Sequence, residues 1–198
     1  MRNWQVRATA GTFAALLMIG GSVLSTAHAA APGALASKDT LTLPNDVAAL
    51  LDDCKDDEII GAERQSLCTE LVGNTQLPPA VRAEALVYRG IILLDDGHVN
   101  LAMADFEAAV VLNPNDPMAH AYRGEVFKVR NRPADALAAY DTAVSLDGDS
   151  ADLFANRGEL HRQLGASDKA RADFEAALKI ERDHRTAIAG LKALTRKK

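Results

Sequence analysis

Three similar ten-residue stretches lie at a constant spacing in this 198-residue chain. They read YRGIILLDDG, YRGEVFKVRN and NRGELHRQLG and begin at residues 88, 122 and 156, so that successive copies are 34 residues apart. A fixed period of roughly 20 to 50 residues is typical of repeat arrays. Around the copies, apolar residues recur with helical spacing between short turns, and no segment alternates as a strand would. The period therefore predicts an all-helical array.

Each repeat divides into two predicted helices. In the last repeat Gly165 separates the helices, and in the middle repeat Asn131 and Pro133 mark the same break. One helical pair cannot bury its apolar face alone, so stacked neighbours have to complete the core. The repeats are predicted to span residues 83–116, 117–150 and 151–184.

The repeats resemble the tetratricopeptide repeat (TPR) family over residues 83–184. That family has a small residue midway along the first helix, then an alanine, an aromatic residue and a second alanine along the second helix. The three repeats match with Gly90, Gly124 and Gly158; Ala102, Ala136 and Ala170; Phe106, Tyr140 and Phe174; and Ala109, Ala143 and Ala177. The closing proline occurs only once, as Pro114. The resemblance implies a right-handed α-solenoid of antiparallel helix pairs.

The two ends of the array are predicted to differ from the repeats. Residues 44–82 read as a degenerate helix pair, in which Cys54 and Cys68 lie on apolar stripes that include Val47, Leu50, Leu51, Ile60, Leu67 and Leu71. A disulfide between the two cysteines would pin this pair and stabilise it by about 3 kcal/mol. Residues 185–198 are predicted to form a capping helix with Ile188, Leu191 and Leu194 turned inward.

The N-terminus has the pattern of a signal peptide over residues 1–29. Arg2 and Arg7 precede a mostly apolar run without acidic residues, and Ala27 and Ala29 give a small-x-small cleavage pattern. We expect cleavage after Ala29, a flexible leader over residues 30–43, a periplasmic or secreted location and no stable membrane span. An uncleaved anchor is the alternative. An oxidising compartment favours the disulfide, whereas the cysteine spacing lacks a CxxC redox motif.

Charge and motifs argue against several classes of function. Removal of residues 1–29 shifts the formal net charge from −5 to −7, and an acidic chain does not suit phosphate neutralisation on nucleic acids. The histidines after the expected cleavage site form no HxxxH or HExxH pair, so no metal site is predicted. No nucleophile elbow or phosphate loop is present. We therefore predict a protein without cofactor that is not an enzyme.

An arginine precedes the small glycine in every repeat. Two of these arginines, Arg89 and Arg157, have an aspartate sixteen residues later, Asp105 and Asp173, with which they are predicted to pair across the two helices. In the middle repeat Ala139 replaces the aspartate, so Arg123 has to find another partner or face solvent. A ladder of anion-binding arginines is the less favoured alternative.

The resemblance implies that the first helices line a concave groove for a peptide or protein partner. The groove residues would be Glu84, Val87, Ile91 and Leu94; Met118, Ala121, Glu125 and Lys128; and Asp152, Ala155, Glu159 and Arg162. Val87 and Ile91 stand at two places where some members carry a clamp for a terminal carboxylate, so that activity is not implied. The N-terminal pair could instead cover Val87, Ile91 and Leu94. The predicted function is a periplasmic adaptor; a thiol-disulfide redox protein and a self-assembling envelope component are the alternatives.

Overall fold

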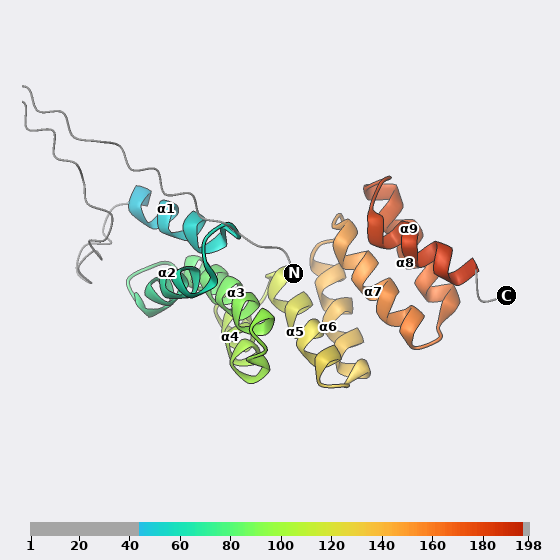
Figure 1. The fold of residues 1–198 in the computed structure, drawn as a ribbon, viewed down its shortest axis with the longest axis horizontal. Helices are drawn as coiled ribbons and strands as arrows, with labels where there is room; N and C mark the ends of the chain where they lie inside the picture. Colours follow the sequence, from blue (N-terminus) through green and yellow to red (C-terminus); the bar gives the residue numbers. More distant parts are fainter. Residues whose placement is uncertain (1–43, 196–198) are drawn as a thin grey trace, which may run out of the picture. The chain divides into compact units, whose positions relative to one another are not determined.

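The computed structural model describes residues 44–195; the expected signal segment, the leader and residues 196–198 lie outside this range. Within residues 44–195 every regular element is a helix, as predicted, and none of these helices is long and apolar enough to cross a membrane. Figure 1 shows them in chain order: α1 (Pro44–Lys55), α2 (Gly61–Gly73), α3 (Pro79–Asp95), α4 (Val99–Leu112), α5 (Pro117–Val129), α6 (Pro133–Leu146), α7 (Ala151–Gln163), α8 (Ser167–Ile180) and α9 (Arg185–Thr195).

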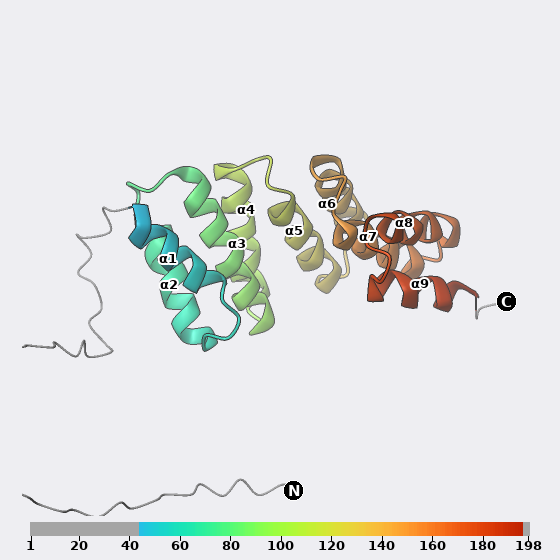
Figure 2. The same ribbon diagram turned by 90° about the horizontal axis from the view of Figure 1, so that it is seen from above.

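Helices α3 to α8 form antiparallel pairs, one pair for each sequence repeat. Helix α3 packs against α4, α5 against α6 and α7 against α8, and the second helix of each pair also contacts the first helix of the next (Figures 1 and 2). Helix α3 begins at Pro79, ahead of the expected repeat boundary at residue 83. In this added turn the Arg82 Nε donates a hydrogen bond to the Val72 carbonyl oxygen at 3.2 Å, which connects α3 to the end of α2.

The turns inside the three repeats share one backbone conformation. Gly97, Asn131 and Gly165 have φ values of 79°, 55° and 77°, a region that favours glycine and tolerates asparagine. These three residues are 34 positions apart, so the turn recurs with the period of the sequence. Between the first two repeats, the Asp116 carboxylate caps α5 by accepting hydrogen bonds from the backbone N–H groups of Met118 and Ala119 at 2.9 and 3.3 Å.

The aromatic residues of the second helices form the centre of the core. Phe106, Tyr140 and Phe174 are fully buried, and a glycine of the preceding first helix faces each ring. The ring of Phe174 also packs against Gly190 of α9. In α9 the buried residues are Ala187, Gly190 and Leu194, with Leu191 half-buried.

The prediction that Ile188 faces inward is wrong. Its side chain is 47% exposed, because the stripe of α9 that packs on the array consists of residues 187, 190, 191 and 194. Ile60 is also exposed, at 76%, although it had been assigned to the buried stripe of α2. It lies at the N-terminal boundary of that helix, outside its packed face.

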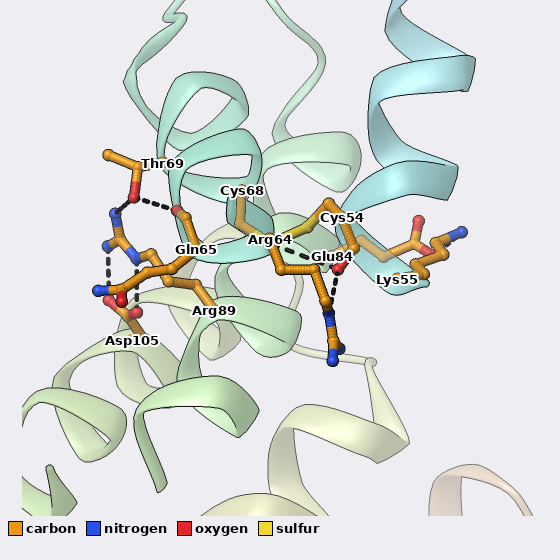
Figure 3. The surroundings of a disulfide bond; sticks show 9 residues. All are labelled: Cys54, Lys55, Arg64, Gln65, Cys68, Thr69, Glu84, Arg89 and Asp105. Carbon is orange, nitrogen blue, oxygen red and sulfur yellow. Dashed lines mark hydrogen bonds and ion pairs between the residues drawn. A yellow bond between two sulfur atoms is a disulfide. The ribbon is translucent and has the colours of Figure 1, made fainter. Parts of the chain in front are cut away.

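The N-terminal pair is held together at its two cysteines. The Sγ atoms of Cys54 in α1 and Cys68 in α2 lie 2.14 Å apart, at disulfide distance, and both residues are fully buried (Figure 3). Polar contacts connect the pair to α3: the Lys55 Nζ lies 2.6 Å from a carboxylate oxygen of Glu84, and Arg89 donates to the Thr69 hydroxyl at 3.4 Å. The pair is therefore packed against the first repeat.

Candidate functional site

A pocket of about 550 Å³ lies between α5 and α7, the first helices of the second and third repeats. Four of the predicted groove residues line it: Met118, Ala121 and Glu125 from α5 and Asp152 from α7. The structure therefore brings together groove positions from two repeats that are far apart in the sequence. The complete lining is Pro117, Met118, Ala121, Tyr122, Glu125, Asp147, Ser150, Asp152, Leu153 and Asn156.

The sequence-based groove assignment missed six of these lining residues. Tyr122 follows Ala121 and stacks on the Phe106 ring of α4, with 5.5 Å between the ring centroids, whereas Leu153 and Asn156 belong to α7. Asp147 and Ser150 belong to the turn between α6 and α7. The family pattern names residues along one helix face at a time, so it does not contain the flanks and turns that close a pocket between two helices.

The lining of the pocket carries an excess of negative charge, although Lys128, outside the lining, pairs with Glu125. Three carboxylates, from Glu125, Asp147 and Asp152, belong to its lining, and no lysine or arginine does. Met118, Leu153 and the ring of Tyr122 supply apolar surface between them. Such an arrangement suits a cationic group on an apolar stem, which the carboxylates attract while the stem covers the apolar wall.

Glu125 is held in place by two neighbours. The Lys128 Nζ lies 2.8 and 3.0 Å from its two carboxylate oxygens, and the Tyr140 hydroxyl donates a short hydrogen bond to it. Burial raises the pKa of Tyr140 above its usual value, and the adjacent negative charge of Glu125 raises it further. Tyr140 therefore stays protonated and continues to donate. Because Glu125 has partners in the core, its replacement would disturb packing as well as any binding.

Asp152 is held from the other side of α7. The buried His184 has its Nε2 at 2.9 Å from an Asp152 carboxylate oxygen, and its Nδ1 accepts a hydrogen bond from the Ala187 backbone N–H at 3.3 Å. The proton of a neutral imidazole therefore lies on Nε2 and is donated to the carboxylate. The Asp152 side chain is nevertheless 85% exposed, so most of its surface remains open to a ligand.

The other predicted groove residues of the third repeat lie outside the pocket. Ala155 is fully buried and offers no surface for a partner. Glu159 and Arg162 form a two-point ion pair at 2.6 and 2.7 Å, and the Arg162 guanidinium lowers the pKa of Glu159. These two charges are neutralised by each other, so this part of the face carries little net charge.

In the first repeat the groove positions are largely occupied. Val87 is 1% exposed, and Ile91 and Leu94 are half-buried against the core of the array. Glu84 is engaged with Lys55 at the end of α1. The repeats themselves, and not the N-terminal pair, contribute most of this packing. The accessible part of the predicted groove lies between α5 and α7.

The repeated arginines behave as the sequence predicted. Arg89 pairs with Asp105 through two contacts of 2.7 Å, and Arg157 pairs with Asp173 through contacts of 3.0 and 2.7 Å. Arg157 also reaches Asp141 at 2.9 Å. Arg123 has no ion-pair partner within residues 44–195. The arginines of the first and third repeats therefore form structural ion pairs, and the arginine of the middle repeat does not.

In the part of the chain that the structure describes, no three His, Cys, Asp or Glu side chains come together as metal ligands. The two cysteines are covered on all sides, so that an attacking thiol has no path to either sulfur.

Comparisons with known proteins agree with this architecture. A family model described as tetratricopeptide repeat matches twice, over residues 89–151 and 123–184. A search among curated proteins gave no significant match.

Among solved structures, the TPR domain of OM64 from Arabidopsis is 22% identical, with a TM-score of 0.57, and the alignment covers 61% of this chain and 99% of that domain. MamA is 20% identical, with a TM-score of 0.58 and coverages of 70% and 84%. The second TPR domain of human RPAP3, solved with the HSP70 peptide SGPTIEEVD, is 23% identical, with a TM-score of 0.55 and coverages of 59% and 98%.

These similarities establish the fold, and the family match rests on the same positions that carry the period of 34 residues. Through the repeats between residues 89 and 184, the chain belongs to the tetratricopeptide repeat family.

Proposed function

We propose that the protein is a non-enzymatic scaffold that binds a peptide segment of a partner protein in the pocket between α5 and α7. Three carboxylates around an apolar-walled pocket without a basic residue carry this proposal. The partner segment would insert a lysine or arginine, with its aliphatic stem against Met118 and Leu153 and its charge near Asp147 and Asp152. Peptide binding by related folds supports the general mode, as in the RPAP3 domain solved with an HSP70 peptide.

The proposed partner differs in charge from that HSP70 peptide. The sequence SGPTIEEVD is acidic, whereas the pocket of this chain repels acidic groups. The structural likeness therefore supports a groove for peptides, and the lining residues determine which peptides fit.

We also propose a periplasmic or secreted location. The pattern of residues 1–29 and the cysteine pair at disulfide distance support it, because disulfides persist in oxidising compartments. Intact-mass analysis of protein from the cell envelope tests this part. A mass that begins at residue 30 supports it, and a mass that retains residues 1–29 in a soluble fraction contradicts it.

The binding experiment uses a substitution that leaves the internal contacts of the site intact. Met118 lines the pocket and is 38% exposed, so Met118→Lys places a positive charge in the pocket without removing an ion pair. Val111→Lys is the matched control, because Val111 is 79% exposed and lies outside the lining. Crosslinking capture from the envelope identifies the partner, and labelled peptides from it are then compared by fluorescence anisotropy.

We expect Met118→Lys to weaken binding of the partner peptide roughly tenfold or more, and Val111→Lys to leave it unchanged. Replacement of the critical Lys or Arg in the peptide by Leu or Glu should give progressively weaker binding. Equal affinity of the two variants, or preference for the Glu peptide, would show that the pocket is not the binding site for a cationic group. Circular dichroism of each variant confirms that the fold is retained.

A further inference from the structure

The second repeat lacks one half of an ion pair that the first and third repeats contain. In those repeats the carboxylates of Asp105 and Asp173 are buried and each receives two hydrogen bonds from the arginine of the facing helix. The corresponding residue of the second repeat is Ala139, which ends at the β-carbon. The backbone and the arginine are therefore retained while the carboxylate group alone is deleted.

A cleft of about 240 Å³ is present at this place, between α5 and α6. Its lining consists of His120, Arg123, Phe127, Asp135, Ala138, Ala139 and Thr142. None of these residues lines the pocket between α5 and α7, so α5 presents two different faces to two hollows. The cleft is thus separate from the proposed peptide site.

The Arg123 guanidinium is only partly satisfied by its surroundings. Its Nε is buried and has no hydrogen-bond partner among the described residues. The equivalent Arg157 also uses Asp141 of the preceding repeat, but Glu107, which occupies that position before Arg123, makes no ion pair with it in the described range. A buried donor without an acceptor is unfavourable, so an incoming acceptor would be stabilised.

The other polar groups of the cleft are already engaged. Asp135 is paired with Arg132 at 2.8 Å, which reduces its repulsion of an incoming anion. His120 lies with its Nε2 at 2.9 Å from the Pro114 carbonyl oxygen, and Thr142 donates its hydroxyl hydrogen to the Ala138 carbonyl oxygen at 3.0 Å. Arg123 is therefore the group in this cleft that remains available for a charged ligand.

We propose that Arg123 and this cleft bind a small carboxylate, whose carboxylate group takes the position that the Asp105 and Asp173 side chains occupy in the flanking repeats. Arginine binds a planar carboxylate through two parallel N–H donors, which fits this chemistry better than a spherical halide. Since Nε is covered in the present conformation, the guanidinium turns toward the cleft when the ligand enters. The cleft has room for a short substituent on the carboxylate, along Ala138 and Thr142.

The experiment follows the Nε–H resonances of the arginines in ¹H–¹⁵N spectra while formate is added at constant ionic strength. Formate is the probe because it has the size of the deleted group. We expect a saturable shift of the Arg123 resonance toward the positions of the paired Arg89 and Arg157, with a dissociation constant between about 1 and 100 mM, as befits a ligand of three heavy atoms. Sodium chloride at equal ionic strength should not reproduce the shift.

Three variants make the readout specific. Arg123→Lys assigns the resonance, because it removes the Nε–H group of residue 123 from the spectrum. Ala139→Asp supplies the carboxylate internally, so its Arg123 resonance should lie near those of Arg89 and Arg157 without formate and should not respond to it. Asp105→Ala creates the same arrangement in the first repeat, and formate should then also shift the Arg89 resonance.

Blocked aspartate, with both ends of the residue amidated or acetylated, separates two sources of carboxylate. If the Arg123 resonance responds to formate alone, the site binds free small carboxylates. If it responds to formate and to blocked aspartate, the site also accepts an aspartate side chain of a partner protein. The proposal is overturned if the Arg123 resonance of the unmodified protein already matches those of Arg89 and Arg157 and ignores formate, or if chloride shifts it equally. If Ala139→Asp does not fold, Asp105→Ala and the chloride control still decide the question.

Discussion

Gly90 of α3 lies so close to the ring of Phe106 in α4 that a β-carbon on residue 90 would come within 2.5 Å of Cε1. Phe106 is fully buried, and close-packed interiors leave a ring little room to move. We therefore expect Gly90→Ala to lower the free energy of unfolding by about 1–3 kcal/mol, the usual cost of overpacking a core. Urea denaturation monitored by circular dichroism measures this change.

Gly73→Ala is the matched control, because no atom lies within 4 Å of the added β-carbon at the end of α2. Alanine is the better helix former, so this variant should be as stable as the unmodified protein or more stable by up to about 1 kcal/mol. Gly124→Ala should lie between the two, since its β-carbon would meet the Tyr140 ring at 3.2 Å. Equal stability of all three variants would contradict the close-packing argument.

The cysteine pair should contribute strongly to the stability of the array. Cys54 and Cys68 are 14 residues apart in sequence, and a covalent bond that closes such a loop is worth about 3 kcal/mol. We expect the Cys54→Ala, Cys68→Ala double variant to unfold at a lower urea concentration by a corresponding amount. Alkylation and mass analysis of the unmodified protein, denatured without reductant, should find no free thiol. Two alkylated cysteines in that sample would show that the bond does not form.

The buried ion pair of the third repeat should matter more than an exposed one. The side chain of Asp173 is 8% exposed and receives two hydrogen bonds from Arg157, so Asp173→Asn should cost about 2 kcal/mol of unfolding free energy. Asp135→Asn is the comparison, because the Arg132–Asp135 pair is 55% and 43% exposed and should contribute less than about 1 kcal/mol. Comparable losses in the two variants would exclude burial as the cause.

His161 should make the protein less stable in mild acid. Burial lowers the pKa of His161 from its usual value of 6.5, and the nearby Asp173 offsets this only in part. The unfolded state therefore binds a proton more readily than the folded state, so the free energy of unfolding falls as the pH drops below about 6.5. His161→Gln should have a flatter stability profile between about pH 7 and pH 5. Parallel profiles from urea titrations at each pH would contradict this assignment.

Much of the fold follows from spacing because repeated contacts require repeated residue types. Gly90, Gly124 and Gly158 each face an aromatic ring sixteen residues later, and the Arg–Asp pairs join the same two helices. Such contacts are local in the sequence and recur with its period. Helix pairing, turn positions and two of the ion pairs could therefore be predicted from the residues alone.

The features that the sequence did not predict depend on how one helix pair packs against the next. Ile60 and Ile188 are exposed because Ile60 lies at the boundary of α2 and Ile188 lies off the face of α9 that packs on the array. The apolar spacing of one helix does not show where the helix begins or which face it packs. The burial of Val87 depends on how the first repeat packs against the second, and the contact between Lys55 and Glu84 depends on the docking of the N-terminal pair. The flanks and turns that complete the candidate pocket likewise belong to the interface between repeats.

The two ends of the array are stabilised by different contacts, so we expect unfolding to begin at one end and proceed toward the other. Stability in a linear stack is the sum of each unit and its contacts with its neighbours, so fraying starts at an end. The N-terminal pair has two cysteines at disulfide distance, which the expected bond would cross-link, whereas the C-terminal end is closed by the single helix α9. Helix α9 and then the third repeat should open first, so amide hydrogens should exchange fastest there and progressively more slowly toward α2.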